Sequence, residues 1–108
     1  MANQPAIVVE SRDDNAYARV SGKLDHEVLE RLGREATGSA PLILSLAAVT
    51  YVSSSGLAGL AKLSSRRDLR LVALPRMVRD TIGLAGLDRI LRIFEDEQAA
   101  AAAPGGVL

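Results

Sequence analysis

The chain has 108 residues, enough for one domain with a single hydrophobic core. Hydrophobic residues make up 48% of it but aromatic residues only 3%, so the core has to be built from aliphatic side chains. Thirteen basic and thirteen acidic residues cancel, which excludes a strong positive field for attracting nucleic acid, and the absence of cysteine excludes disulfides and thiol catalysis.

The N-terminal sequence MANQPAIVVESRDD has neither the basic region nor the long apolar run of a signal peptide. Nowhere do about eighteen apolar residues follow one another, so no membrane-spanning helix is expected. These features predict a cytoplasmic protein without direct membrane insertion.

Two strands and a helix are predicted in the first third of the chain. Residues 7 to 9 form an apolar run, closed by the turn-rich sequence SRDDN at residues 11 to 15. AYARV, residues 16 to 20, alternates large and small side chains and suits a strand that pairs back on the first as a hairpin. Apolar residues at helical spacing then predict an amphipathic helix over residues 26 to 37, ending near Gly38.

The middle of the chain holds the most apolar predicted strands. PLILSLAAV, residues 41 to 49, is a nearly continuous apolar run, which predicts a central strand buried on both faces. An apolar stripe that includes Leu57 and Leu60 predicts a helix over residues 54 to 66. LRLVAL, residues 69 to 74, predicts another buried strand.

The last third continues the alternation. Pro75 suits the first turn of a third helix. RILRIF, residues 89 to 94, predicts a strand, and DEQAAAAA, residues 96 to 103, predicts a short helix that is weakly anchored or loose. The residues of the third helix expected to face inward are Val78, Ile82 and Ala85.

The predicted order is therefore β-β-α-β-α-β-α-β-α. Short connections between alternating elements indicate an α/β fold, in which about four helices pack on a mixed sheet of four or five strands. Because no linker or internal repeat interrupts it, we expect one domain over residues 1 to 104 and a disordered tail over residues 105 to 108.

A small serine hydrolase is one function that the residues leave open. Its nucleophile elbow needs Gly-x-Ser-x-Gly, and Gly56 follows Ser54 at that spacing, but Val52 occupies the leading glycine position. A triad would also need the only histidine, His26, beside Asp25, to reach the serine. The simpler interpretation places this histidine in the first turn of a helix.

Other catalytic and binding chemistries have little support. One histidine and scattered carboxylates give no metal-ligand spacing, so the acids are interpreted as a solvated surface. GLAG, residues 56 to 59, lacks the lysine and hydroxyl of a phosphate-binding loop. Arg66, Arg67 and Arg70 have no interleaved aromatic residues and are interpreted as a solvated helix end. We expect no cofactor, no metal and no nucleic-acid partner.

Three consecutive serines, Ser53, Ser54 and Ser55, separate a predicted buried strand from a predicted helix. One serine suffices as the N-cap of that helix. The carboxyl ends of strands in α/β sheets are also where ligands and partners dock. A phosphate here would be favoured by the helix N-terminus and would add nearly two negative charges to the surface. A reversible phosphoserine is therefore a functional hypothesis beside simple capping.

Four stretches of the chain carry a resemblance to a known family. They are SGKLDHEVLERL at residues 21 to 32, LILSLAAVTYVSSSGLAGL at 42 to 60, LVALPRMVRDTIGLAGL at 71 to 87 and RIFED at 92 to 96. The family's marks are Gly-x-Leu-Asp at the end of the second strand and Asp-Ser-Ser/Thr-Gly-Leu at the start of the second helix, with Gly86-Leu87 following. In these stretches the chain resembles the STAS domain, and within it the bacterial anti-sigma factor antagonists.

The resemblance implies a regulatory binding protein rather than an enzyme. In that family an anti-sigma factor, which is a serine kinase, phosphorylates the first serine after the motif aspartate, and a phosphatase removes the phosphate. The unphosphorylated antagonist binds the anti-sigma factor and frees the sigma factor. By position, the phosphate acceptor is Ser54. The partner-binding residues that the resemblance implies are Asp25, His26, Ser53, Ser54, Ser55, Gly56 and Leu57.

The chain departs from the family pattern at one site residue, because Ser53 occupies the place of the motif aspartate. The departure leaves open a relative with a different partner, or one that is never phosphorylated. One such alternative is a STAS adaptor subunit of a membrane lipid-transport ATPase complex.

Overall fold

The computed structural model describes residues 7–105, which form a five-stranded sheet, four α-helices and one short 3₁₀ helix. The predicted element order and the mixed sheet are confirmed. Residues 1–6 and 106–108, on which parts of the predicted N-terminal start and C-terminal tail fall, lie outside the described residues. In chain order the elements are β1 (Ile7–Arg12), β2 (Asn15–Leu24), α1 (His26–Glu35), β3 (Leu42–Val52), α2 (Ser54–Arg66), β4 (Leu69–Val72), α3 (Arg76–Leu84), η1 (Leu87–Arg89), β5 (Arg92–Phe94) and α4 (Glu97–Ala102).

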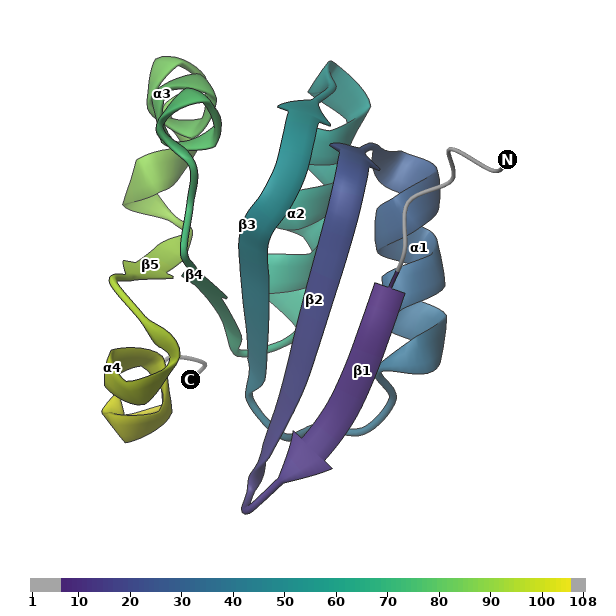
Figure 1. The fold of residues 1–108 in the computed structure, drawn as a ribbon, viewed down its shortest axis with the longest axis vertical. Coiled ribbons are helices and arrows are strands. Elements are labelled where there is room, and N and C mark those ends of the chain that lie inside the picture. The colour runs from purple at the N-terminus through teal and green to yellow at the C-terminus, as the bar shows by residue number, and fades with distance from the viewer. Residues whose placement is uncertain (1–6, 106–108) are drawn as a thin grey trace.

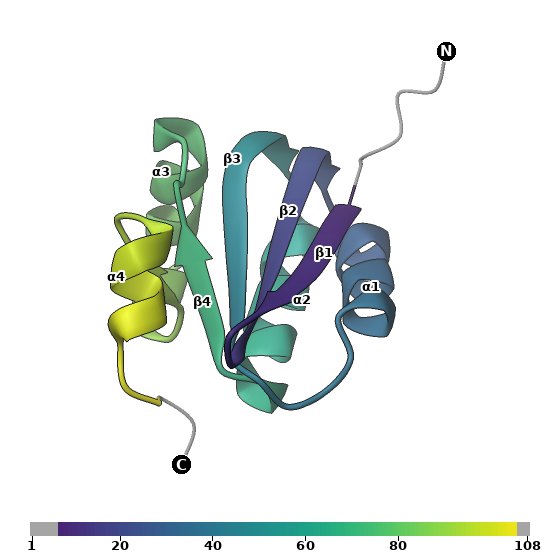
Figure 2. The same cartoon turned by 60° about the horizontal axis from the view of Figure 1, so that its bottom comes forward.

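The strands lie in the sheet in their chain order (Figure 1). β1 and β2 form the predicted antiparallel hairpin, and β2 to β5 are parallel neighbours. Each parallel connection crosses over through a helix, and successive right-handed crossovers in one direction place their helices on the same face. Accordingly, α1, α2 and α3 all contribute side chains to one buried cluster. Figures 1 and 2 both show α1 and α2 beside the β1–β3 part of the sheet.

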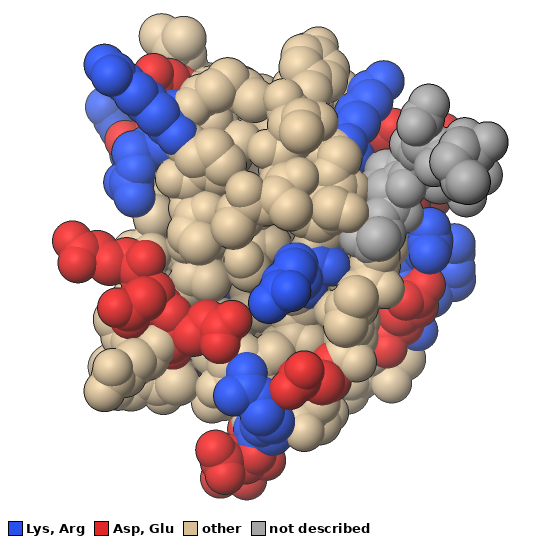
Figure 3. Space-filling model, viewed as in Figure 1, with Lys and Arg blue, Asp and Glu red and all other residues tan. Residues whose placement is uncertain are grey.

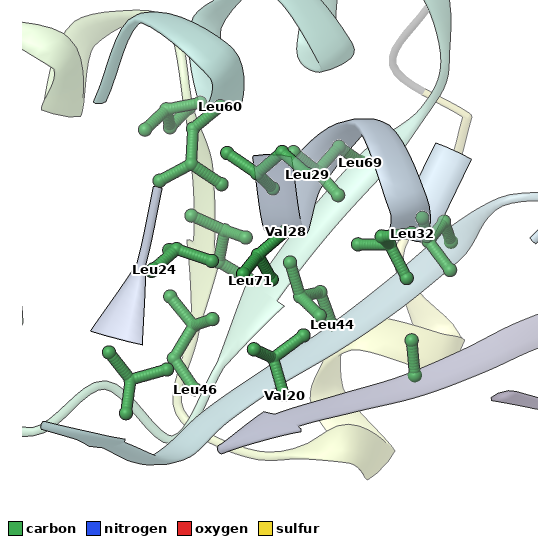
Figure 4. Packing of buried hydrophobic residues seen from close by; sticks show 14 of the residues in the cluster. Val20, Leu24, Val28, Leu29, Leu32, Leu44, Leu46, Leu60, Leu69 and Leu71 are labelled. Carbon is green, nitrogen blue, oxygen red and sulfur yellow. The ribbon is translucent and has the colours of Figure 1, made fainter. Parts of the chain in front are cut away.

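This main cluster is built from aliphatic side chains alone, as the composition requires. Figure 4 shows Leu24 from β2 and Leu44 and Leu46 from β3 packed against Leu29 of α1 and Leu60 of α2. Burying a leucine side chain contributes about 1.5–3 kcal/mol. The cluster therefore fixes the positions of α1 and α2 on the sheet, and with them the position of the serine-rich turn.

The prediction that residues 41 to 49 are buried on both faces is wrong for the second half of that stretch. Leu42 to Leu46 are buried, but Ala47 and Ala48 are exposed. The cause is an irregular register, in which Arg19 pairs with Ser45 but Ser21 pairs with Ala48. The extra residue of β3 breaks the inside–outside alternation, as a β-bulge does.

Two of the three arginines predicted at a solvated helix end are buried, and only Arg66 is exposed. The Arg67 guanidinium folds back onto the end of α1, where it donates to the carbonyl oxygens of Ala36 and, at 2.8 Å, of Ala40. Burial lowers the pKa of Arg67. The side chain therefore closes the loop between α1 and β3, because it satisfies carbonyls that a helix end leaves without partners.

The second buried arginine holds α4 against the other face of the sheet. Arg70 is 2% exposed, ion-pairs with Asp68 at 2.8 Å and donates to the Ala100 carbonyl oxygen at 2.6 Å. Asp68, with 10% of its side chain exposed, also pairs with Arg92 at 2.9 Å, so this acid is not part of a solvated surface. Ala100 is fully buried, and α4 is anchored rather than loose.

The predicted strand over residues 89 to 94 is shorter than expected, because its first residue closes the 3₁₀ helix η1 and only Arg92–Phe94 pair with β4. In α3 the predicted inward residues Val78 and Ile82 are buried, but Ala85 follows the end of the helix and is exposed.

Figure 3 shows the sheet side opposite α1 and α2, where a broad uncharged area has charged side chains around its margins.

Candidate functional site

The candidate site is the corner where β2 and β3 end and α1 and α2 begin (Figure 1). Because β2 and β3 are parallel neighbours, their carboxyl ends lie at the same edge of the sheet. The structure thus brings together two segments that are far apart in the sequence. We call residues 25–26 and 53–57 the Ser54 corner. It contains all the residues predicted to bind a partner, namely Asp25, His26, Ser53, Ser54, Ser55, Gly56 and Leu57.

Ser53 is the serine that caps α2. Its backbone is extended, and its Oγ accepts a hydrogen bond from the Gly56 amide at 3.0 Å. Its own amide donates to the Leu24 carbonyl oxygen at 3.0 Å, which fixes the start of α2 against the end of β2. Serine and aspartate are comparable N-cap residues, so serine at this motif position preserves the cap, removes the negative charge and adds a hydroxyl that donates to the Leu24 carbonyl oxygen at 3.4 Å.

The two helix starts also share hydrogen bonds. Asp25 caps α1, because its Oδ1 accepts from the Val28 amide at 3.0 Å. Ser55 Oγ, which belongs to α2, accepts from the His26 amide of α1 at 3.3 Å and lies 3.0 Å from Ser53 Oγ. A side chain of one helix therefore satisfies an amide that the other helix leaves without an intrahelical partner.

Gly56 is required where α2 passes over the end of β2. A Cβ atom at this position would lie 2.3 Å from the Leu24 carbonyl oxygen and 3.3 Å from the Asp25 Cα. Both contacts are with backbone, which cannot rotate away. The glycine therefore sets how closely the first turn of α2 approaches α1 and β2.

Ser54 takes no part in the caps of α1 and α2. It is the first residue of α2 and is exposed. Within residues 7–105 its hydroxyl makes no hydrogen bond, whereas Ser53 and Ser55 are both engaged. Its position beside the free amides of a helix start favours a negatively charged group.

The other predicted site residues differ in how much surface they present. His26 is exposed and is the first residue of α1, as predicted. Leu57 is half-buried and packs against the main cluster, so only part of its surface is available to a partner. In the described part of the chain, no hydrogen bond joins the His26 imidazole to a serine hydroxyl.

Tyr51, at the end of β3, is exposed and was not among the residues predicted for the site. Its side chain is 54% exposed, and the Lys23 ammonium lies 6.0 Å from the centre of its ring. Tyrosine is enriched at the energetic centres of protein interfaces. The signal available in the sequence was its place just before the serines, in a strand whose neighbouring Val52 faces the core.

Residues 7–105 contain no group of three or more His, Cys, Asp or Glu side chains placed to hold a metal ion. No helix in the same range is long and apolar enough to cross a membrane.

A model of the STAS domain family matches residues 6–100. The chain belongs to the STAS domain family.

Solved structures with the STAS fold include an anti-sigma factor antagonist from Mycobacterium paratuberculosis, which is 24% identical, with a TM-score of 0.74, over 91% of this chain and 92% of that one. A serine-to-glutamate variant of RsbS from Moorella thermoacetica is 21% identical over 88% and 91% of the two chains, with a TM-score of 0.69. The Bacillus cell fate determinant SpoIIAA in its phosphorylated form is 18% identical over 87% and 96%, with a TM-score of 0.56. These likenesses establish the shared STAS fold.

The cap of α2 gives a first prediction for this STAS chain. Ser53→Ala is expected to lower the free energy of unfolding by about 1 kcal/mol, because the Gly56 amide loses its acceptor. Ser53→Asp restores the motif acid, keeps an acceptor and places a negative charge at the positive end of the helix, so stability should stay within about 0.5 kcal/mol of wild type or rise. Urea denaturation of the three proteins checks this, and an equal loss in both variants would contradict the capping role.

Proposed function

We propose that the chain is an anti-sigma factor antagonist, a binding protein that recognises an anti-sigma factor through the Ser54 corner and thereby frees a sigma factor. In this proposal the partner is a serine kinase that phosphorylates Ser54, which ends the complex. A serine phosphatase restores the binding form. Family membership and the fold shared with an anti-sigma factor antagonist support this choice.

The observation that carries the proposal is the division of roles among the three serines. Ser53 and Ser55 are engaged in the caps of α2 and α1, whereas Ser54 is exposed and its hydroxyl is free of hydrogen bonds within residues 7–105. A kinase can therefore modify Ser54 without breaking either cap. Modification of Ser53 would instead remove the hydroxyl proton that Ser53 Oγ donates to the Leu24 carbonyl oxygen and would place a phosphate at the cap that holds the Gly56 amide.

The switch in this proposal is electrostatic. A phosphate adds about −1.5 to −2 charges at neutral pH, and the start of α2 stabilises that charge within the domain. The same charge lies on the surface that binds the partner, so it repels acidic groups there and must lose water before the two surfaces can meet. The fold stays intact while the affinity for the partner falls.

Ser54→Asp is expected to weaken binding to the cognate anti-sigma factor by about 10- to 100-fold, because a permanent charge stands at the centre of the interface. Ser54→Ala should bind about as tightly as wild type, since the hydroxyl makes no hydrogen bond within residues 7–105. Titration calorimetry with the purified partner measures both affinities.

Ser11→Asp is the matched control. Ser11 is an exposed serine at the end of β1, beside the start of β2 and therefore at the opposite edge of the sheet from the Ser54 corner. Ser11→Asp introduces the same charge at that position, and this variant should bind the partner as tightly as wild type does. If Ser54→Asp and Ser11→Asp bind equally well, the proposed switch is wrong.

A further inference from the structure

A groove of about 850 Å³ lies between α1 and α2. Figures 1 and 2 show these two helices side by side, both starting at the Ser54 corner. The groove begins there with His26 and Ser55 in its wall, and it extends to Arg66 and Arg67 at the end of α2. It is therefore continuous with the surface proposed to bind the partner.

The middle of the groove is lined by apolar and small residues. Leu29 of α1 and Leu63 of α2 are part of its wall, and both pack against the main cluster. Between them the two helices approach closely, since a Cβ on Gly59 would lie 2.6 Å from Leu29 Cδ1. A Cβ on Gly33, on the opposite wall, would meet no atom within 4 Å. The groove thus has an apolar floor and a low wall, over which another backbone can approach.

The far end of the groove carries an excess of positive charge. Arg34, Lys62 and Arg66 are exposed in its wall, and none of them forms an ion pair within residues 7–105. The only acidic residue in the described wall is Glu30. The C-terminal ends of α1 and α2 supply only about half a negative charge each. The exposed cations therefore outnumber the negative charge near them.

The buried Arg67 adds a further positive charge to this end. It lies in the groove wall with 9% of its surface exposed, and two of its guanidinium nitrogens donate to carbonyl oxygens of the α1–β3 connection. Its Nη2 is buried and has no hydrogen-bond partner within residues 7–105. Buried guanidinium donors are normally paired, so this nitrogen is an exception, and the charge of Arg67 adds to that of the basic end.

We propose that this groove binds an acidic amphipathic helix, whose apolar side chains lie between Leu29 and Leu63 and whose carboxylates reach Arg34, Lys62 and Arg66. An amphipathic helix fits because two parallel helices with a small-residue seam leave space for a third. Among the described residues, no phenylalanine, tyrosine or tryptophan lines the groove, and one imidazole, that of His26, does not make the series of stacking rings that single-stranded nucleic acid uses. The assignment of this helix to the anti-sigma factor rests on the proposed function. The proposal that the groove binds an acidic amphipathic helix does not depend on that assignment.

Peptide selection tests the groove without that partner. A phage library of random 16-residue helical peptides is selected against the full chain, and the enriched peptides are synthesised and titrated by fluorescence anisotropy. We expect the enriched peptides to be acidic on one helical face and apolar on another. Their affinity should fall about 10- to 100-fold in the double variant Lys62→Glu with Arg66→Glu, and this loss should shrink as salt is raised from about 50 to 500 mM.

Arg79→Glu is the control variant, because Arg79 is exposed on α3 and is not part of the groove wall. It should bind the selected peptides as wild type does, and circular dichroism should show that all variants are folded. Enriched peptides that are basic or neutral, binding that the double variant leaves unchanged, or no enrichment at all would overturn the proposal. Ser54 phosphorylation is measured separately, so either proposal can fail while the other holds.

Discussion

Gly56→Ala is expected to lower the free energy of unfolding by about 2–3 kcal/mol, a large effect for the addition of one methyl group. The added Cβ would lie 2.3 Å from the Leu24 carbonyl oxygen, which is part of the backbone at the end of β2. Relief would require the first turn of α2 to move away from α1. That movement would break the hydrogen bond between Ser55 Oγ and the His26 amide and would displace Ser54.

Gly59→Ala, one turn further along α2, is the matched comparison. There the added Cβ meets the end of the Leu29 side chain at 2.6 Å, and a leucine methyl can rotate away at a smaller cost, about 1 kcal/mol. Guanidinium denaturation of both variants gives the two costs, and partner binding should fall further for Gly56→Ala. If the two alanines were equally well tolerated, the close approach at Leu24 would not be the constraint described above.

Asp68→Ala is expected to destabilise the fold by about 3–5 kcal/mol. Asp68 pairs with Arg70 at 2.8 Å and with Arg92 at 2.9 Å, and the side chains of Asp68 and Arg70 are 10% and 3% exposed. Removing the carboxylate leaves a buried guanidinium without its counter-charge, which costs far more than an exposed pair contributes. The anchor of α4 should loosen at the same time, because Arg70 also holds the Ala100 carbonyl oxygen.

Asp80→Ala serves as its control, because Asp80 forms an exposed pair with Arg76 on α3 at 4.0 Å. Its removal should change stability by less than about 0.5 kcal/mol. Chemical denaturation gives both values, and amide hydrogen exchange at Ala100 reports whether α4 opens before the rest of the chain. A loss below about 1 kcal/mol for Asp68→Ala, or unchanged exchange in α4, would contradict the role assigned to this pair.

Local patterns predicted the elements and the cap of α2 well, because these depend on residues close together in the sequence. A serine between a buried strand and an apolar helical stripe indicates an N-cap, and Ser53 is that cap. Parallel pairing of β2 and β3 then places the His26 amide beside Ser55. The exchange of hydrogen bonds between the two helix starts was not predictable, since it depends on the close approach at Gly56.

The errors arose where residues distant in the sequence decide burial. Arg67 and Arg70 look like the solvated end of a helix, yet the partners that bury them are carbonyl groups 27 to 34 residues away. The sequence contained one signal that Arg70 is buried. Arg70 interrupts the otherwise apolar strand β4, which begins directly after Asp68. The two exposed alanines of β3 were missed because a bulge depends on the register with the neighbouring strand.

We propose that Ser54 is a reversible phosphate acceptor that controls partner binding. The most direct measurement incubates the chain with the anti-sigma kinases of its own organism and ATP, followed by mass spectrometry and a binding assay. We expect one phosphate on Ser54, none in Ser54→Ala, and loss of the complex on modification. A chain that stays unmodified while it binds a transport ATPase, or a phosphorylated chain that still binds its kinase as tightly, would show that the proposed switch is wrong.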